Sequence, residues 1–181
     1  MLQVTSIIIA CVCTFWVTPG DVFGDLQTRS ENNGLDFFKV IQIHPNGVAI
    51  LDTDEDGDLE CLKAVRTKFE EGQAADYVWI LKGLHGRPKR NITVHFKKAD
   101  QPDRAIVAID DDEDWKQESR LIYADYKNCA VVEIPYNDNT QCMLWTSEEA
   151  KDNVPSQCTE EFRKNCDKEV VAYDKATCNQ V

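Results

Sequence analysis

The sequence has few basic residues and no long apolar run beyond residue 17. Lys and Arg number 20 against 32 Asp and Glu, which gives a formal net charge of −12. Nucleic acids and anionic membranes bind basic surfaces, so this charge argues against both as partners. A bilayer core of roughly 30 Å needs a longer apolar segment than any that follows. The sequence therefore predicts a mature protein without a membrane span.

Motifs of common enzymes and metal sites are also missing. The sequence has no nucleophile elbow, no metal-binding helix, no phosphate-binding loop and no Cys-x-x-Cys pair. The three histidines, His44, His85 and His95, show no ligand spacing. Residues 52–59 (DTDEDGDL) are similar to the first half of a calcium loop, but Lys63 stands where that loop needs a bidentate Glu. We therefore expect no enzyme activity, no metal and no cofactor.

The one long apolar run lies at residues 4–17 (VTSIIIACVCTFWV), and small residues follow it up to Gly24. Its length suits a secretory signal peptide, although no Lys or Arg precedes it. A buried N-terminal helix or strand is the alternative. We predict a signal peptide over residues 1–24 and one domain over residues 25–181, hence a secreted protein. Asn91 begins the only N-glycosylation sequon, which predicts a glycan at that surface position.

Six cysteines remain once the predicted signal peptide, with Cys11 and Cys13, is removed. An even number of cysteines in a small secreted chain is typical of a disulfide framework. Six cysteines allow fifteen pairings, and the spacing alone selects none of them. The six are Cys61, Cys129, Cys142, Cys158, Cys166 and Cys178.

The middle of the chain consists of short strand-like segments separated by turn formers. Several alternate between apolar and polar residues, as residues 77–82 (YVWILK) do. Eight short strands at this spacing favour an antiparallel barrel or sandwich. A short helix is expected before them at residues 34–43, and a second after them at residues 155–166, with Ser156 as its N-cap. The expected strands are 48–51, 59–69, 76–82, 91–97, 105–110, 119–126, 130–135 and 141–147.

This order of elements is similar to that of a lipocalin, and the C-terminal third narrows the resemblance. The segments 128–132 (NCAVV), 142–145 (CMLW), 153–158 (NVPSQC) and 177–178 (TC), with 58–61 (DLEC), resemble the tick salivary lipocalins of the histamine-binding-protein family. The resemblance implies an all-β, eight-stranded antiparallel barrel with a short N-terminal helix and a C-terminal helix packed on it. It also implies the bridges Cys61–Cys178 and Cys129–Cys158, which leaves Cys142 and Cys166 for a third.

The family's histamine sites are acidic, and this chain departs from that pattern. Met143 replaces the Glu of the family's Glu-Leu-Trp motif, and Ala130 replaces the acidic residue after the strand cysteine. Arg120 and Arg90 align with two further acidic positions, whereas Asp52 aligns with one remaining acid. Losing one buried carboxylate partner costs a bound cation about 2–5 kcal/mol. The sequence therefore favours a sterol or another lipid over histamine.

The expected inner wall of the barrel is apolar and aromatic. Each of its residues could equally be an ordinary core residue that contacts no ligand. On this lining the chain looks most like the Japanin-type branch, for which the resemblance implies cholesterol binding and modulation of host dendritic cells. The predicted ligand-binding residues are Trp79, Arg120, Ile122, Ala130, Val132, Ile134, Met143 and Trp145.

The resulting hypothesis is a tick salivary protein that holds a small hydrophobic ligand and dampens host immunity. Its expected partners are that ligand and host immune cells or receptors, and we expect a monomer or a weak homodimer. One alternative is a scavenger of biogenic amines such as histamine and serotonin. Another is an inhibitor of host defence that binds proteins and whose barrel is filled.

Overall fold

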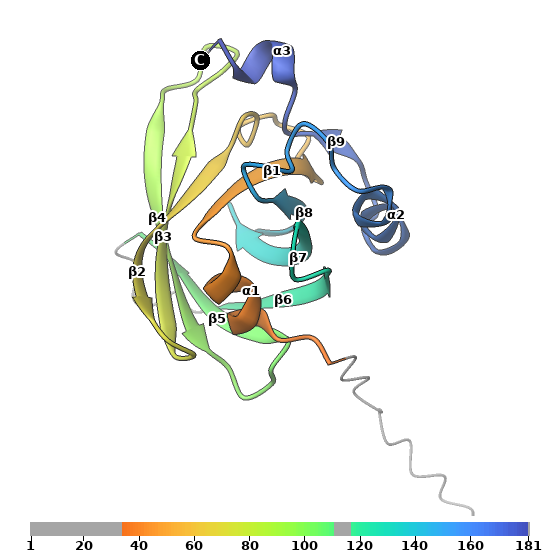
Figure 1. Cartoon of the computed structure of the whole chain (residues 1–181). Helices are drawn as coiled ribbons and strands as arrows, with labels where there is room; N and C mark the ends of the chain where they lie inside the picture. Colours follow the sequence, from red (N-terminus) through yellow and green to blue (C-terminus); the bar gives the residue numbers. More distant parts are fainter. Residues whose placement is uncertain (1–33, 111–116, 181) are drawn as a thin grey trace, which may run out of the picture. The chain divides into compact units, whose positions relative to one another are not determined.

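Eight antiparallel strands close into a barrel in the computed structural model, which describes residues 34–110 and 117–180 (Figure 1). The strands follow one another around the sheet, and pairing of β2 with β1 closes it, while β9 adds to the far edge of β1. The predicted fold class is therefore confirmed. The predicted signal peptide lies outside the described residues. The strands are β1 Asn46–Asp52, β2 Lys63–Glu70, β3 Ala74–Leu81, β4 Arg90–Lys98, β5 Arg104–Ile109, β6 Gln117–Ala124, β7 Cys129–Tyr136, β8 Asn139–Thr146 and β9 Val170–Val171.

Strand alternation explains why one side of the sheet faces inward. In β3 every second residue is buried, namely Ala75, Tyr77, Trp79 and Leu81, and all four belong to the inner core. Residues two apart on a strand share a face, so this pattern places their side chains inside the barrel. β7 is buried on both faces because its outer face is covered as well.

The covering element on that outer face is helix α2, Ser156–Asn165, which contacts β6, β7 and β8 (Figure 1). Its residue Phe162 is fully buried against the barrel, in a second core with Val131 and Leu144. Pro155 precedes the first helical residue, and no side chain caps this end. The expected cap, Ser156, is instead the first residue of the helix, since proline already supplies an extended backbone there.

Helix α1, Phe37–Ile43, lies at one end of the barrel. Asp36 caps it by accepting a hydrogen bond from the backbone N–H of Lys39 at 3.0 Å. Phe37, Phe38 and Ile41 are buried, as the sequence predicts.

Three disulfides join the C-terminal segment to the barrel: Cys61–Cys178, Cys129–Cys158 and Cys142–Cys166. This is the pairing that the family resemblance implies. Two of them attach α2 to β7 and β8. The third attaches the connection between β1 and β2 to the short helix α3, Lys175–Cys178.

The connection between β1 and β2 differs from the prediction of a strand over residues 59–69. β2 begins only at Lys63, and the residues before it form a turn in which Cys61 has a φ of +58°. The Cys61 N–H donates to the carbonyl of Ala172 at 2.7 Å, so the C-terminal segment holds this turn in place. The sequence did not predict β9 and α3. Among the described helices, none is long and apolar enough to cross a membrane.

Candidate functional site

A small cavity of about 100 Å³ lies inside the barrel beneath α1. Helix α1 forms one wall with Phe37, Val40 and Ile41. Apolar side chains from β2, β3, β4, β7 and β8 form the rest, and none of the described lining residues is an Asp or a Glu. The strand residues are Ala64, Tyr77, Trp79, Phe96, Ala130, Val132, Ile134 and Trp145, and His44, Asn46, Gly47, Asn128, Cys129 and Thr146 surround them near α1.

Aromatic rings dominate this interior. The indoles of Trp79 and Trp145 lie 5.5 Å apart, centroid to centroid, with their planes at 44°. Tyr77 meets Phe96 edge to face at 5.8 Å. The Tyr77 hydroxyl donates to the carbonyl of His44 at 2.7 Å, and burial raises the pKa of Tyr77 to about 12. The phenol therefore stays neutral at physiological pH and connects the cavity wall to the end of α1.

Gly47 is a lining residue that sequence reasoning missed. A Cβ atom built on it would lie 3.1 Å from Cε3 of Trp145, closer than most contacts of a real Cβ. The missing side chain lets the Trp145 indole lie flat against β1. The lining residues of α1 were also missed, because a helix that covers a barrel end cannot be assigned to the cavity from its own periodicity. Tyr77 was available from the sequence, since it has the same strand parity as Trp79.

Five of the eight predicted ligand-binding residues line the cavity: Trp79, Ala130, Val132, Ile134 and Trp145. Met143 is fully buried in the same inner core but is not among the lining residues. Asn91 lies exposed on β4, with its backbone in register with Ile80.

Arg120 and Ile122 do not reach the cavity, which corrects the prediction for β6. Leu121 is the residue of this strand that packs in the inner core, so its two neighbours point outward. The Arg120 side chain is about half exposed and lies 4.0 Å from Asp103. Ile122 packs against the outer core beneath α2, beside an irregularity in the pairing of β6 with β7.

The opposite end of the barrel is acidic. Oxygen atoms from the carboxylates of Asp54, Asp56 and Asp58 lie within 4.8 Å of one another. Asp52 is only 2% exposed, and burial, opposed by a hydrogen bond from the Asp54 N–H, raises its pKa to about 7. Burial and then the Asp56 carboxylate raise the pKa of Asp54 to about 6. These shifts express the cost of gathering negative charges in a partly buried turn.

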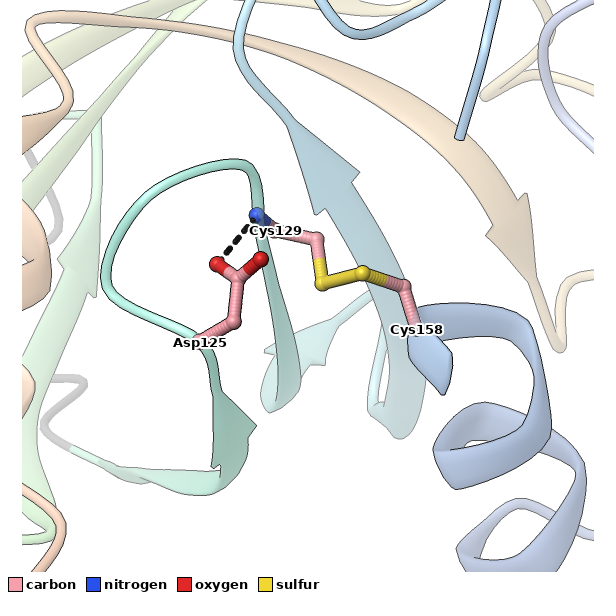
Figure 2. A group of neighbouring side chains, drawn as sticks. All are labelled: Asp125, Cys129 and Cys158. Carbon is pink, nitrogen blue, oxygen red and sulfur yellow. Dashed lines mark hydrogen bonds between the residues drawn. A yellow bond between two sulfur atoms is a disulfide. The ribbon is translucent and has the colours of Figure 1, made fainter. Parts of the chain in front are cut away.

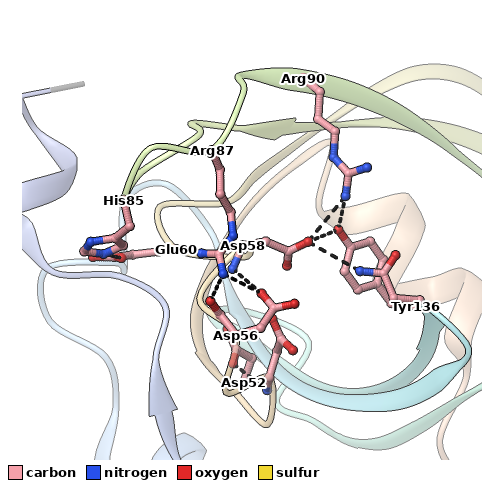
Figure 3. A network of polar contacts seen from close by, with 10 residues as sticks. Asp52, Asp56, Asp58, Glu60, His85, Arg87, Arg90 and Tyr136 are labelled. Carbon is pink, nitrogen blue, oxygen red and sulfur yellow. Dashed lines mark hydrogen bonds and ion pairs between the residues drawn. The ribbon is translucent and has the colours of Figure 1, made fainter.

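Basic and phenolic side chains offset part of this charge, as Figure 3 shows. The Asp58 carboxylate accepts a hydrogen bond from the Tyr136 hydroxyl at 2.6 Å and lies 3.3 Å from Nη2 of Arg90. Arg90 also donates to the Tyr136 oxygen at 2.6 Å. Arg87 pairs with Asp56 at 3.4 Å. The acidic turn is therefore tied to β4 and to the end of β7.

A second group with the composition of a metal site is Asp125, Cys129 and Cys158 (Figure 2). The two sulfur atoms are bonded to each other, so neither is a thiolate ligand. Asp125 accepts hydrogen bonds from the backbone N–H groups of Lys127, Asn128 and Cys129. Burial opposes ionisation here, but these bonds outweigh it and lower the pKa of Asp125. The group is a structural turn that leads into β7.

Comparison with protein families gives a match to the tick histamine-binding protein model over residues 52–180. The chain belongs to this family. A comparison with curated protein sequences finds no match.

Solved structures with the same fold include other tick and arthropod proteins. A crystal structure of AM182 in complex with serotonin has a TM-score of 0.56 and 17% identity, over 76% of this chain and 89% of that one. Japanin from Rhipicephalus appendiculatus bound to cholesterol has a TM-score of 0.53 and 12% identity, over 73% and 94%. Insecticyanin from the tobacco hornworm Manduca sexta has a TM-score of 0.53 and 12% identity, over 80% and 85%. At these identities the likeness shows the lipocalin fold.

Proposed function

We propose that this tick lipocalin is secreted and holds a neutral, mostly apolar small molecule, and that it modulates host immune or inflammatory responses through that ligand. The apolar lining of the cavity carries the proposal. A cation needs a buried carboxylate to offset its loss of hydration, and the described lining supplies none. A sterol or another lipid gives up few hydrogen bonds to water on entering such a cavity, and burial of its apolar surface favours binding.

The cavity volume sets a condition on this proposal. Ligand sites for drug-sized molecules enclose roughly 300–1,000 Å³, and an engineered cavity of about 150 Å³ binds benzene. At about 100 Å³ the cavity accepts only part of a sterol in the conformation described. Binding of a sterol therefore requires the barrel to widen. Japanin, which shares the fold, is bound to cholesterol in its solved structure.

Identification of the co-purified molecule tests the proposal. The chain is expressed with its own leader in insect cells, collected from the medium, and studied by native mass spectrometry and by organic extraction. We expect a bound neutral lipid, and the same spectra report whether the leader is removed and whether Asn91 carries a glycan. Ala130→Leu fills the cavity and should abolish the adduct, whereas Ala108→Leu on the outer face of β5 should retain it. An empty wild-type barrel would contradict the proposal.

A second candidate function is capture of a biogenic amine at the acidic end. Asp52 ends β1 after a bulge and is only 2% exposed, so its carboxylate is a buried acid at this end of the barrel. Its raised pKa reflects burial without full compensation, which an ammonium group would supply. Calorimetry with histamine and serotonin distinguishes the two candidates. Submicromolar binding that Asp52→Asn abolishes would favour the amine.

A further inference from the structure

At the loop end of the barrel, where β1–β2, β3–β4 and β7–β8 connect, described side chains separate the cavity from the surface hollow beside Arg90, Ile92 and Tyr136. Leu59 and Leu62 from the β1–β2 connection are fully buried in the inner core, together with Leu81 and Tyr136. At the same end Asp58 accepts hydrogen bonds from Tyr136 and Arg90 (Figure 3). A ligand entering here would have to displace both the leucines and the ionic network.

The α1 end is different, because polar and partly exposed residues border the cavity there. His44 and Asn128 are half-buried and Asn46 is exposed, and all three line the cavity. Trp145 faces inward and yet is partly exposed, while Trp79, deeper in the barrel, is only 2% exposed. Exposure of an inward-facing ring indicates that the interior opens to solvent beside it.

We propose that the ligand of this barrel enters and leaves past α1, with its apolar part against Trp145 and Trp79 and its polar group at the rim of His44, Asn46 and Asn128. This rests on the proposed function of small-molecule binding. Helix α1 supplies three apolar lining side chains, so its outward movement both opens the cavity and enlarges it. The same movement supplies the volume that a sterol needs.

Few polar contacts hold the end of α1 to the barrel. Nη1 of Arg66, on β2, donates to the carbonyl of Ile41 at 2.5 Å. The Tyr77 hydroxyl donates to the same carbonyl at 3.3 Å and to that of His44 at 2.7 Å. The Arg66 guanidinium lies outside the cavity, over the ring of Phe69. Removing it weakens the attachment of α1 without changing the cavity wall.

Exchange kinetics in two matched pairs of variants test the route. The probe is dehydroergosterol, a fluorescent sterol, followed by stopped-flow fluorescence of the tryptophans. Arg66→Ala should raise both the association and the dissociation rate at least fivefold, with a smaller change in affinity. Arg90→Ala, which loosens the opposite end, should leave both rates within twofold of wild type. Faster exchange in Arg90→Ala, or unchanged exchange in Arg66→Ala, would overturn the route.

The second pair blocks each end by adding a bulky side chain at an exposed position. Asn46→Trp at the rim should slow exchange at least fivefold, whereas Asn139→Trp at the start of β8 should not. Thermal unfolding identifies any variant that fails to fold. If one does, the other pair of variants tests the route. If wild type does not bind this sterol, the proposed function fails together with the route. If it binds the sterol and neither α1-end variant changes the rates, only the route fails.

Discussion

The indole of Trp145 lies 5.5 Å from that of Trp79 and directly over Gly47, which has no side chain to displace it. One ring is held by the core, and the other borders the opening to solvent. The two residues therefore differ in what they contribute. Trp79 contributes mainly to stability, and Trp145 mainly to ligand contact.

Substitution of each tryptophan separates these contributions. Trp79→Ala should lower the free energy of unfolding by about 3–5 kcal/mol, the usual cost of removing a large buried aromatic. Trp145→Ala should cost less, because its side chain is already partly exposed, and yet weaken ligand binding at least as much. Urea denaturation and ligand titration measure the two effects. Equal losses of stability would contradict the assignment.

Asp52 should make the protein less stable as the pH rises. Its pKa is about 7 when folded and about 3.8 when unfolded, so between these values the folded state binds more protons. The free energy of unfolding therefore falls from about pH 4 to about pH 7 on account of this group. Asp52→Asn removes that dependence, so its melting temperature relative to wild type should be higher at about pH 8 than at about pH 5. Parallel melting curves for the two proteins across this range would refute the shift.

The disulfides should differ in their effect on stability. The Cys61–Cys178 bridge spans 117 residues, whereas Cys129–Cys158 and Cys142–Cys166 span 29 and 24. Loop-closure entropy predicts about 5 kcal/mol for the long bridge and about 3.5 kcal/mol for each short one. Paired serine substitutions, one bridge at a time, should reproduce this order in denaturant unfolding. A larger loss of stability on removal of either short bridge would show that packing of α2 in the folded state contributes more than the loop-closure entropy of the unfolded chain.

The inward direction of Leu121 can be tested against its neighbour. Leu121→Ala should cost about 2–5 kcal/mol, since it leaves a hole in the inner core. Arg120→Ala should cost far less, because the Arg120 side chain is about half exposed and its ion pair with Asp103 is 4.0 Å long. A larger loss of stability from Arg120→Ala than from Leu121→Ala in thermal unfolding would indicate that Arg120, not Leu121, points into the barrel.

Much of this fold could be predicted from the sequence because its signals are local. The alternation around Trp79 identifies a strand with one buried face. The segments that contain Cys129 and Cys158 carry part of the family resemblance, and the structure joins these two cysteines in a disulfide. The inward-facing side of β6 could not be predicted from its sequence. Helix α2 covers its outer face, so an apolar residue such as Ile122 does not identify the inner side.

The candidate site was harder to predict than the fold. Its α1 wall depends on how a seven-residue helix packs across a barrel end, which no local pattern specifies. The turn before β2 depends on the distant Ala172 carbonyl and on the bridge to Cys178. Contacts between residues far apart in the chain determined the features that the sequence missed.

All three bridges brace the same side of the molecule. They anchor β7, β8 and the β1–β2 connection, whereas strands β2 to β6, within the described ranges, carry none. Helix α1 contacts that side through Arg66 of β2, Tyr77 of β3 and the Pro102 carbonyl in the turn after β4, and its N-terminal end also contacts Tyr126 between β6 and β7. One side of the barrel is thus held by covalent cross-links, and the other, which α1 also contacts, is not. Widening of the side without cross-links would let the barrel accommodate a ligand larger than the cavity without breaking a covalent bond.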